Sequence, residues 1–137
     1  MVRVVSCILA FLAIASAGRA DDRGIDVELN KLEASGAACR AYLVLQNRAG
    51  SGFHSLKLDL VMFDTEGVVA KRLAVEAAPL ANGKTSLKVF DIAGQTCDGI
   101  GRILLNDVLA CQDADGPRQD CLAMTRTAAR GPVPFIK

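Results

Sequence analysis

The sequence has few of the residues on which most catalytic and metal sites depend. Its one histidine, His54, has neither a second histidine nor a recognisable acidic partner, so no histidine-rich metal site or catalytic triad can be assembled around it. Ser51 and Ser55 lie close to His54, but Ser51–His54 has the composition of an exposed loop. We therefore expect no catalytic residue, no metal ligand and no cofactor.

Aromatic residues and clusters of basic residues are also scarce. The chain has no tryptophan and one tyrosine, whereas carbohydrate-binding faces usually rely on exposed aromatic rings. Its 16 basic and 15 acidic residues almost balance, and no basic cluster marks a nucleic-acid surface. We therefore expect neither a sugar nor a nucleic acid as the partner.

Long apolar runs are confined to the N-terminus, where Arg3 precedes the apolar stretch Val4–Ala17 and small residues follow it. This pattern is typical of a cleavable signal peptide and is too short for a stable membrane anchor. The alternative is a retained N-terminal membrane helix. We predict a signal peptide over residues 1–20, with cleavage before Asp21 rather than after Ala17, and a periplasmic mature chain without a membrane span. The remaining 117 of the 137 residues suffice for one domain.

The mature chain contains seven segments with the features of β-strands. Four of them alternate apolar and polar residues, as half-buried strands do, and Ile100–Cys111 is continuously apolar, as a central strand is. Clear turn signals, such as Asp64–Gly67 and Asn82-Gly83, separate them. We predict an all-β domain over residues 21–129, an immunoglobulin-like antiparallel β-sandwich of about seven strands, followed by a C-terminal tail over residues 130–137. Two segments, Val68–Ala78 and Ile103–Leu109, are also compatible with helical turns. The predicted strands are Ile25–Leu32, Cys39–Asn47, Leu56–Phe63, Val68–Val75, Thr85–Ile92, Ile100–Cys111 and Cys121–Thr127.

Four cysteines remain once the signal, which contains Cys7, is removed. An even number of cysteines in a small exported domain is typical of a disulfide framework, and the sequence lacks the Cys-x-x-Cys spacing of redox pairs. In the predicted sandwich, Cys39 begins the second strand and Cys97 precedes the sixth, so both lie near one end. Cys111 and Cys121 flank the last turn. Among three possible pairings, we therefore predict Cys39–Cys97 and Cys111–Cys121.

Four local sequence features follow one another between the second and the fifth predicted strands. They are a strand that ends in asparagine, an apolar strand that ends in Phe-Asp, a Gly-Val-Val return and a Gly-Lys-Thr entry into the next strand. They occupy Leu43–Asn47, Leu58–Asp64, Glu66–Val69 and Pro79–Thr85. The stretch from Leu43 to Ile92 thereby resembles the FxLYD-type and related immunoglobulin-like domains of small secreted bacterial proteins. The resemblance implies an adhesive or structural role without catalytic residues.

Two groups of polar residues are further candidates for a functional site. Asp113, Asp115 and Asp120 could offer oxygen ligands, but the spaced loop that usually delivers the six to eight oxygens preferred by calcium is missing. We expect a solvated turn there. Asn106-Asp107 interrupts the most apolar strand, and a polar pair at this place needs polar partners if it is buried. We expect a bulge or an outward-facing pair, and the functional alternative is an interaction point.

The C-terminal segment Pro132, Val133, Pro134 and Phe135 is the candidate interaction site. The prolines favour an extended chain, and the valine and phenylalanine offer apolar anchors. The segment is expected either to dock on a partner or to fold back onto its own domain.

These features predict a non-enzymatic periplasmic accessory or protein-interaction subunit of a cell-envelope assembly, whose sheet edges are available for strand addition. Two alternatives remain open. One is a periplasmic module that binds a small ligand. The other is a proteinaceous enzyme inhibitor that works through the loops Ala49–His54 or Asp113–Gln119.

Overall fold

The computed structural model describes residues 22–137, and the predicted signal peptide lies outside these residues. The described chain is almost entirely β-structure, with one short 3₁₀ helix (η1) and one short α-helix (α1). The elements in chain order are β1 Ile25–Ser35, β2 Ala38–Asn47, β3 Phe53–Phe63, β4 Val69–Glu76, β5 Thr85–Ile92, η1 Cys97–Gly99, β6 Arg102–Asp113, β7 Gly116–Pro117, α1 Cys121–Met124, β8 Thr125–Ala129 and β9 Phe135–Ile136.

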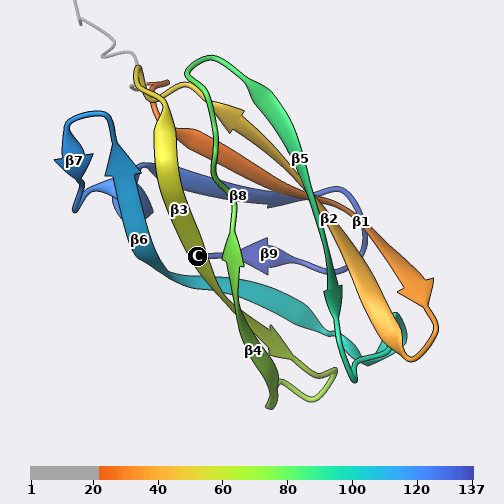
Figure 1. Ribbon diagram of the computed structural model, residues 1–137. Coiled ribbons are helices and arrows are strands. Elements are labelled where there is room, and N and C mark those ends of the chain that lie inside the picture. The colour runs from red at the N-terminus through yellow and green to blue at the C-terminus, as the bar shows by residue number, and fades with distance from the viewer. Residues whose placement is uncertain (1–21) are drawn as a thin grey trace, which may run out of the picture.

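The strands form two sheets that face each other (Figure 1). The first sheet has the order β5-β2-β1-β8, and the second has the order β4-β3-β6-β7, with β9 also paired to β6. Neighbouring strands are antiparallel except for two pairs, β1 with β8 and β6 with β9, which are parallel. The prediction of an all-β, mainly antiparallel sandwich is therefore confirmed, with these two parallel pairs as additions that the sequence analysis does not include.

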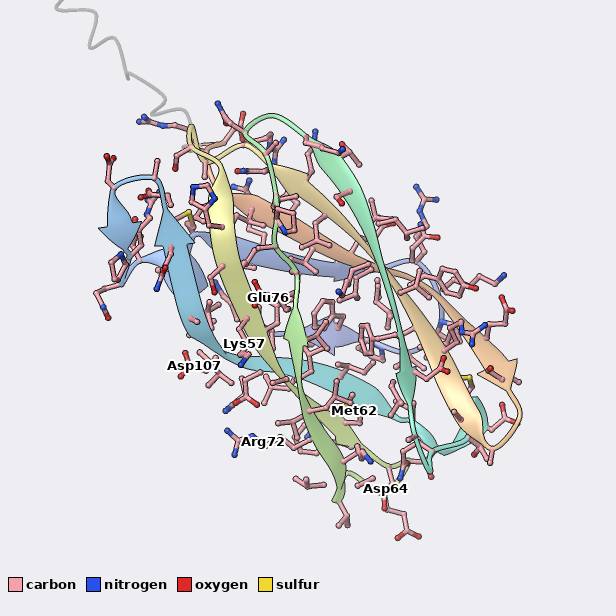
Figure 2. The ribbon with its side chains drawn as sticks, in the orientation of Figure 1. Lys57, Met62, Asp64, Arg72, Glu76 and Asp107 are labelled. Carbon is pink, nitrogen blue, oxygen red and sulfur yellow. A yellow bond between two sulfur atoms is a disulfide. The ribbon has the colours of Figure 1, made fainter. Side chains whose placement is uncertain are left out.

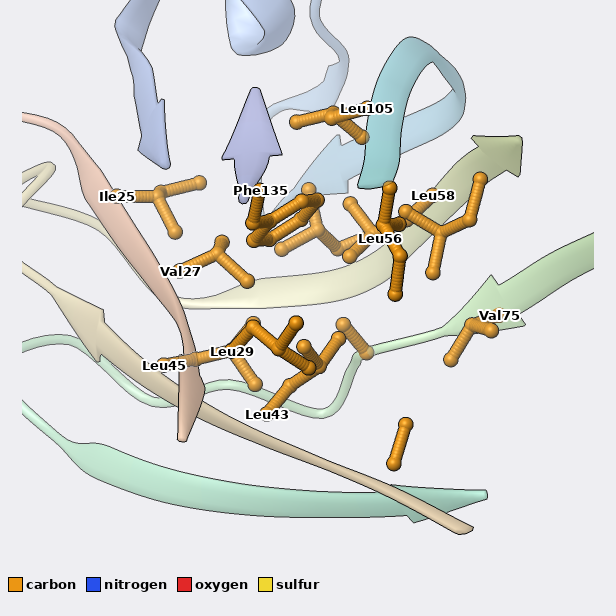
Figure 3. Packing of buried hydrophobic residues seen from close by; sticks show 14 of the residues in the cluster. Ile25, Val27, Leu29, Leu43, Leu45, Leu56, Leu58, Val75, Leu105 and Phe135 are labelled. Carbon is orange, nitrogen blue, oxygen red and sulfur yellow. The ribbon is translucent and has the colours of Figure 1, made fainter. Parts of the chain in front are cut away.

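The core lies between the sheets, where the alternating strands place their apolar residues. On β2 every second residue is buried, which is the pattern that a sheet with one covered face requires, whereas on β3 the run Leu58–Met62 is buried throughout. Figure 3 shows side chains of β1 and β2 packed opposite those of β3 and β6. The largest fully buried side chains of the core are Phe53, Ile25, Leu43, Leu45, Leu56, Leu58, Leu60, Met62, Leu80, Ile92, Ile103 and Leu105.

Strand boundaries differ from the prediction at two places. Phe53 and His54, assigned to an exposed loop, begin β3, and Phe53 is buried in the core because its backbone pairs with Leu80. Cys121–Met124, assigned to the last strand, forms the helical turn α1 instead, and the strand β8 begins only at Thr125. The helical alternatives at Val68–Ala78 and Ile103–Leu109 are not adopted, since both segments lie in strands or their extensions.

The immunoglobulin-like part of the prediction is not confirmed. In the immunoglobulin arrangement the last strand lies beside the sixth, in the sheet that also holds the third. Here β8 pairs with β1 in the opposite sheet, and the places beside β6 are taken by β7 and β9. The second and sixth strands nevertheless lie in opposite sheets, as expected.

Both predicted disulfides are confirmed. Cys39 is joined to Cys97, and Cys111 is joined to Cys121. The first bond ties the start of β2 to η1, which leads into the opposite sheet, and the second ties β6 to α1. Each disulfide therefore connects the two halves of the sandwich. Between residues 22 and 137, no helix is both long and apolar enough to span a bilayer.

The predicted C-terminal tail, residues 130–137, is part of the sandwich rather than an appendage. After β8 the chain crosses from the first sheet to the second, where Phe135 of β9 pairs with Ile103 of β6. The phenylalanine ring is 4% exposed and packs among core side chains of both sheets (Figure 3). The fold-back alternative is the one that the structure adopts, because burial of this ring outweighs the freedom of a terminal segment.

Candidate interaction surface

The strand β5 turns two of its aliphatic residues, Leu87 and Val89, outward. Its partner β2 buries Leu43 and Leu45, so the residues opposite these two, Lys88 and Ser86, lie in the inward-facing register. Leu87 and Val89 therefore face outward, and they are 58% and 41% exposed. An edge strand that points leucine and valine to solvent and lysine and serine inward inverts the usual pattern of a half-buried strand.

The neighbouring strand extends this apolar surface. Val44 lies opposite Leu87, and Tyr42 lies opposite Val89. Both are half-buried on the outer face of the first sheet. We call these four residues, Tyr42, Val44, Leu87 and Val89, the outer patch. Directly opposite pairs on one face have their Cβ atoms about 4.5–5.5 Å apart, so the outer patch is continuous.

Ion pairs surround the outer patch. Arg40 Nε lies 2.8 Å from Asp91 Oδ1 at one end, and Lys31 Nζ lies 2.6 Å from Glu33 Oε2 beside Tyr42. Hydrogen bonds from Arg40 lower the pKa of Asp91, and those from Lys31 lower the pKa of Glu33. The carboxylates at this rim are thus ionised and paired at neutral pH.

Charged pairs also line the far side of the same sheet face, on β1 and β8. Asp26 accepts hydrogen bonds from Arg48 and Arg126, and Glu28 lies 3.1 Å from Arg130. The arrangement of an apolar centre inside a polar rim is the one found in many protein–protein interfaces. A shallow hollow of about 450 Å³ connects Val44 with this charged side.

A second cluster lies on the outer face of the other sheet. Asp59, on β3, is 2% exposed, yet both of its carboxylate oxygens are satisfied. Arg72 donates two hydrogen bonds of 2.8 Å to it, and Asn106 donates a third of 2.8 Å. The bonds from Arg72 are the largest cause of a lowered pKa at Asp59. Figure 2 shows the Arg72 side chain and Asp107 on the outside of the sandwich.

This cluster explains the polar pair that interrupts the most apolar strand. Asn106 supplies a hydrogen bond to a buried carboxylate, and the register of β6 against β3 shifts next to Asp107. Both the bulge and the polar partner anticipated for this pair are therefore present. Because both carboxylate oxygens of Asp59 accept hydrogen bonds from Arg72 on β4 or Asn106 on β6, the cluster holds β3, β4 and β6 together.

The loops expected to carry an inhibitor's binding surface meet at one end of the sandwich. Arg118 Nη1 donates a 3.1 Å hydrogen bond to Ser51 Oγ, and its Nη2 lies 2.7 Å from Asp120 Oδ2. Arg118 also contacts Asp113, so it occupies the position that a cation between Asp113 and Asp120 would need. Within residues 22–137 no group of three or more possible ligands is arranged around a metal position.

The remaining predicted residues do not assemble into a site. His54 is exposed on β3, and no hydrogen bond or ion pair joins it to Ser51 or Ser55 within residues 22–137. Of the C-terminal candidates, Pro132 and Pro134 are exposed, Val133 is half-buried, and Phe135 is buried in its own core. Phe135 is therefore unavailable as an anchor for a partner in this conformation.

Sequence reasoning did not identify the outer patch. The segment Thr85–Ile92 alternates, so it has one face with Leu87 and Val89 and another with Phe90 and Ile92. Both faces are partly apolar, and the alternation alone does not decide which of them covers the core. Ser86 and Lys88 lie on the same face as Phe90 and Ile92, so the face that covers the core is itself partly polar. This mixed composition was the signal that Leu87 and Val89 could face outward.

Comparison with known proteins gives a fold and no family. No family model matches the chain, so the resemblance to FxLYD-type domains has no such support, and no curated protein matches it. Among solved structures, IrmA from Escherichia coli is similar, with a TM-score of 0.59 and 13% sequence identity over 77% of this chain and 92% of IrmA. At this identity the likeness concerns the fold alone: this chain has a small β-rich fold that IrmA shares.

Proposed function

We propose that this chain is a non-enzymatic interaction domain that binds a protein partner of the cell envelope through the outer patch. The observation that carries the proposal is the outward orientation of Leu87 and Val89 beside Tyr42 and Val44. An apolar centre that includes a tyrosine and lies inside a polar rim has the composition of an interface core. The ion pairs that surround them disfavour partners of the wrong charge pattern.

A non-enzymatic role is supported by how the polar clusters are used. The acidic group with the strongest burial, Asp59, has all its acceptors occupied, and Ser51 is bound to Arg118. A catalytic group needs access to a substrate and a suitably placed acid or base, and neither cluster offers one.

An exported location is supported by the disulfides. Two disulfides in a domain of this size are typical of an oxidising compartment. Together with the predicted signal peptide over residues 1–20, they favour the periplasm, where a cell-envelope partner would be encountered.

Site-specific photo-crosslinking tests the proposal. A benzophenone amino acid replaces Leu87 in one variant and Val69 in a matched control, because Val69 is 59% exposed on β4 and lies outside the outer patch. Both variants are exported and irradiated in intact cells. We expect one discrete envelope partner to crosslink from position 87 and not from position 69.

A second variant decides whether the captured protein depends on the outer patch. Leu87→Ser combined with Val89→Ser removes its exposed aliphatic groups, and exposed positions of this kind change stability by less than about 0.5 kcal/mol each. Co-purification of the partner should be lost while thermal unfolding is nearly unchanged. Equal crosslinking from both positions, or a partner retained by the double variant, refutes the proposal.

A further inference from the structure

The strand β1 has an unpaired edge. Its first half, Ile25–Leu29, pairs with β2 on one side and with β8 on the other. Beyond Leu29 the chain of β8 leaves the sheet, while β1 continues to Ser35 with β2 as its only strand partner within residues 22–137. Figure 1 shows the far end of β1 running on past the end of β8. This part of the strand is about six residues, or roughly 20 Å, long. Every second residue of it turns its backbone N–H and C=O groups away from β2, and a bulge between Leu29 and Lys31 lies at its start.

A cavity lies beside this edge. It has a volume of about 350 Å³ and opens between β1, η1 and the crossing C-terminal segment. Apolar groups of Leu29, Leu32 and Val133 line it, together with the disulfide-bonded Cys97. The volume is at the small end of ligand pockets, which span about 300–1,000 Å³, so the cavity suits a side chain or two better than a large cofactor.

A carboxylate at the cavity supplies a charge preference. Asp98, in η1, lines the cavity, is exposed, and has no hydrogen-bond or ion-pair partner among the described residues. The other charged side chain of the lining, Lys31, is already paired with Glu33. The unsatisfied charge at this site is therefore negative.

Two of the other edges of the sandwich are protected against strand addition. The edge strands β4 and β5 carry Lys71 and Lys88 in the inward-facing register, opposite the buried Met62 and Leu43. Inward-pointing lysines are a common device that prevents edge-to-edge pairing. No residue of the free half of β1 plays this part, since the inward residues there are Leu32, opposite Ala41, and Ala34, opposite Cys39.

We propose that the free edge of β1, Asn30–Ser35, is a second binding site, which takes an extended peptide segment of a partner protein by β-strand addition. One apolar side chain of the peptide fills the cavity, and a lysine or arginine next to it pairs with Asp98. The backbone of the peptide supplies the affinity, and the cavity with Asp98 supplies the selectivity, as in other strand-addition sites. This site adjoins the outer patch, since Lys31 and Glu33 of the edge also belong to the rim of the patch. It uses none of the four patch residues, and it stands whether or not the outer patch binds a partner.

The test uses a fluorescein-labelled hexapeptide that alternates valine with lysine. A control peptide of the same composition groups the three valines and the three lysines, and a second control alternates valine with glutamate. Fluorescence anisotropy should show saturable binding of the valine–lysine peptide and binding at least tenfold weaker for both controls. Equal binding of the alternating and grouped peptides would reduce the interaction to charge attraction and overturn the proposal.

Two variants locate the site. Gly131 lines the cavity, and a Cβ built there meets no atom within 4 Å, so Gly131→Leu fills the cavity while Gly131→Ala leaves most of it open. We expect at least a tenfold loss of affinity for the leucine variant and near-normal affinity for the alanine variant. Asp98→Asn should weaken binding about two- to fivefold, the effect of one exposed ion pair. Unchanged affinity in Gly131→Leu contradicts the proposal.

Hydrogen exchange on the unmodified protein gives a result that does not depend on how the variants fold. Strand addition forms new backbone hydrogen bonds, so alternate amides between Lys31 and Ser35 should exchange at least tenfold more slowly when the valine–lysine peptide is bound. Binding without any protection of these amides would mean that the peptide occupies another surface, and the proposal fails.

Discussion

At the scale of single residues, the most consequential feature is a carboxylate that the fold buries and then satisfies completely. Asp59 is 2% exposed, whereas the side chain of its partner Arg72 is 62% exposed. The arginine therefore loses little hydration, while the aspartate depends on its hydrogen bonds. A buried acceptor that loses its donor costs about 1–3 kcal/mol.

We predict that Arg72→Ala lowers the free energy of unfolding by about 1–3 kcal/mol, because it removes two of the three hydrogen bonds to Asp59. Lys57→Ala is the matched control, since Lys57 is an exposed residue of β3 on the same outer face. Urea unfolding at pH 7 measures both variants. A control that loses as much stability as Arg72→Ala would show that the effect is general to this face.

The same pair predicts how stability depends on pH. The pKa of Asp59 is lower in the folded protein than its ordinary value of about 3.9, so the pair contributes its full stability above that value. The contribution is lost as the pH falls through the lowered pKa of the folded state. The stability difference between the unmodified protein and Arg72→Ala should thus be constant from pH 6 to 8 and shrink below about pH 4. A difference that persists unchanged to pH 2 would assign it to packing of the arginine stem.

A glycine provides a third prediction at this scale. Gly101 lies directly before β6, and a Cβ built there would come within 2.4 Å of the backbone oxygen of Asp64. The backbone of the loop has to move to admit alanine, so Gly101→Ala should lower the melting temperature by several degrees, or about 1–3 kcal/mol. Gly131→Ala, where a Cβ meets open space, should leave the melting temperature nearly unchanged.

At the scale of elements, the C-terminal strand β9 shows how a segment of two residues becomes part of the core. Phe135 fills the space between the sheets at the point where the chain crosses from one to the other. We predict that Phe135→Ala costs about 3–5 kcal/mol, the range for buried phenylalanine. Ile136→Ala, at a neighbouring residue that is 40% exposed, should cost far less. Equal and small effects of both changes would show that Phe135 contributes little to the core, and the segment would again be a candidate tail for docking on a partner.

The elements also show what alternation in a sequence can and cannot decide. Strands such as β2 and β3, with one clearly apolar face, were located to within a few residues because their pattern allows one orientation. Cys121–Met124 was assigned to a strand, but α1 forms there because the disulfide from Cys111 and the crossing to β8 require a turn. The partners of β8 and β9 depend on contacts distant in sequence, and no local pattern specifies them.

At the scale of the whole molecule, the sequence predicts the features that follow from strand order. It does not predict the features that depend on how segments distant in sequence pack against each other. Cysteine positions relative to the strands were enough for the pairing, because the ends of a sandwich bring Cys39 to Cys97. The outer patch was not predictable, because it depends on which face of β5 meets the core. The free edge of β1 was not predictable either, because it results from the place where β8 leaves the sheet.

The two disulfides limit the compartment in which this molecule can fold. The disulfides close loops with sequence separations of 58 and 10, which stabilise the folded state by about 4 and about 3 kcal/mol in the chain-entropy account. A domain of this size has a total stability of about 5–15 kcal/mol, so loss of both bonds removes a large share of it. We expect residues 21–137 produced in a reducing cytosol to be largely unfolded or degraded, and the same chain exported with its signal to be folded and resistant to protease.

Cys39→Ala combined with Cys97→Ala should destabilise the exported protein more than Cys111→Ala combined with Cys121→Ala, because the longer loop restricts the unfolded chain more. Equal protease resistance in both compartments would show that the hydrophobic core alone suffices, and it would remove the disulfides as support for an exported location.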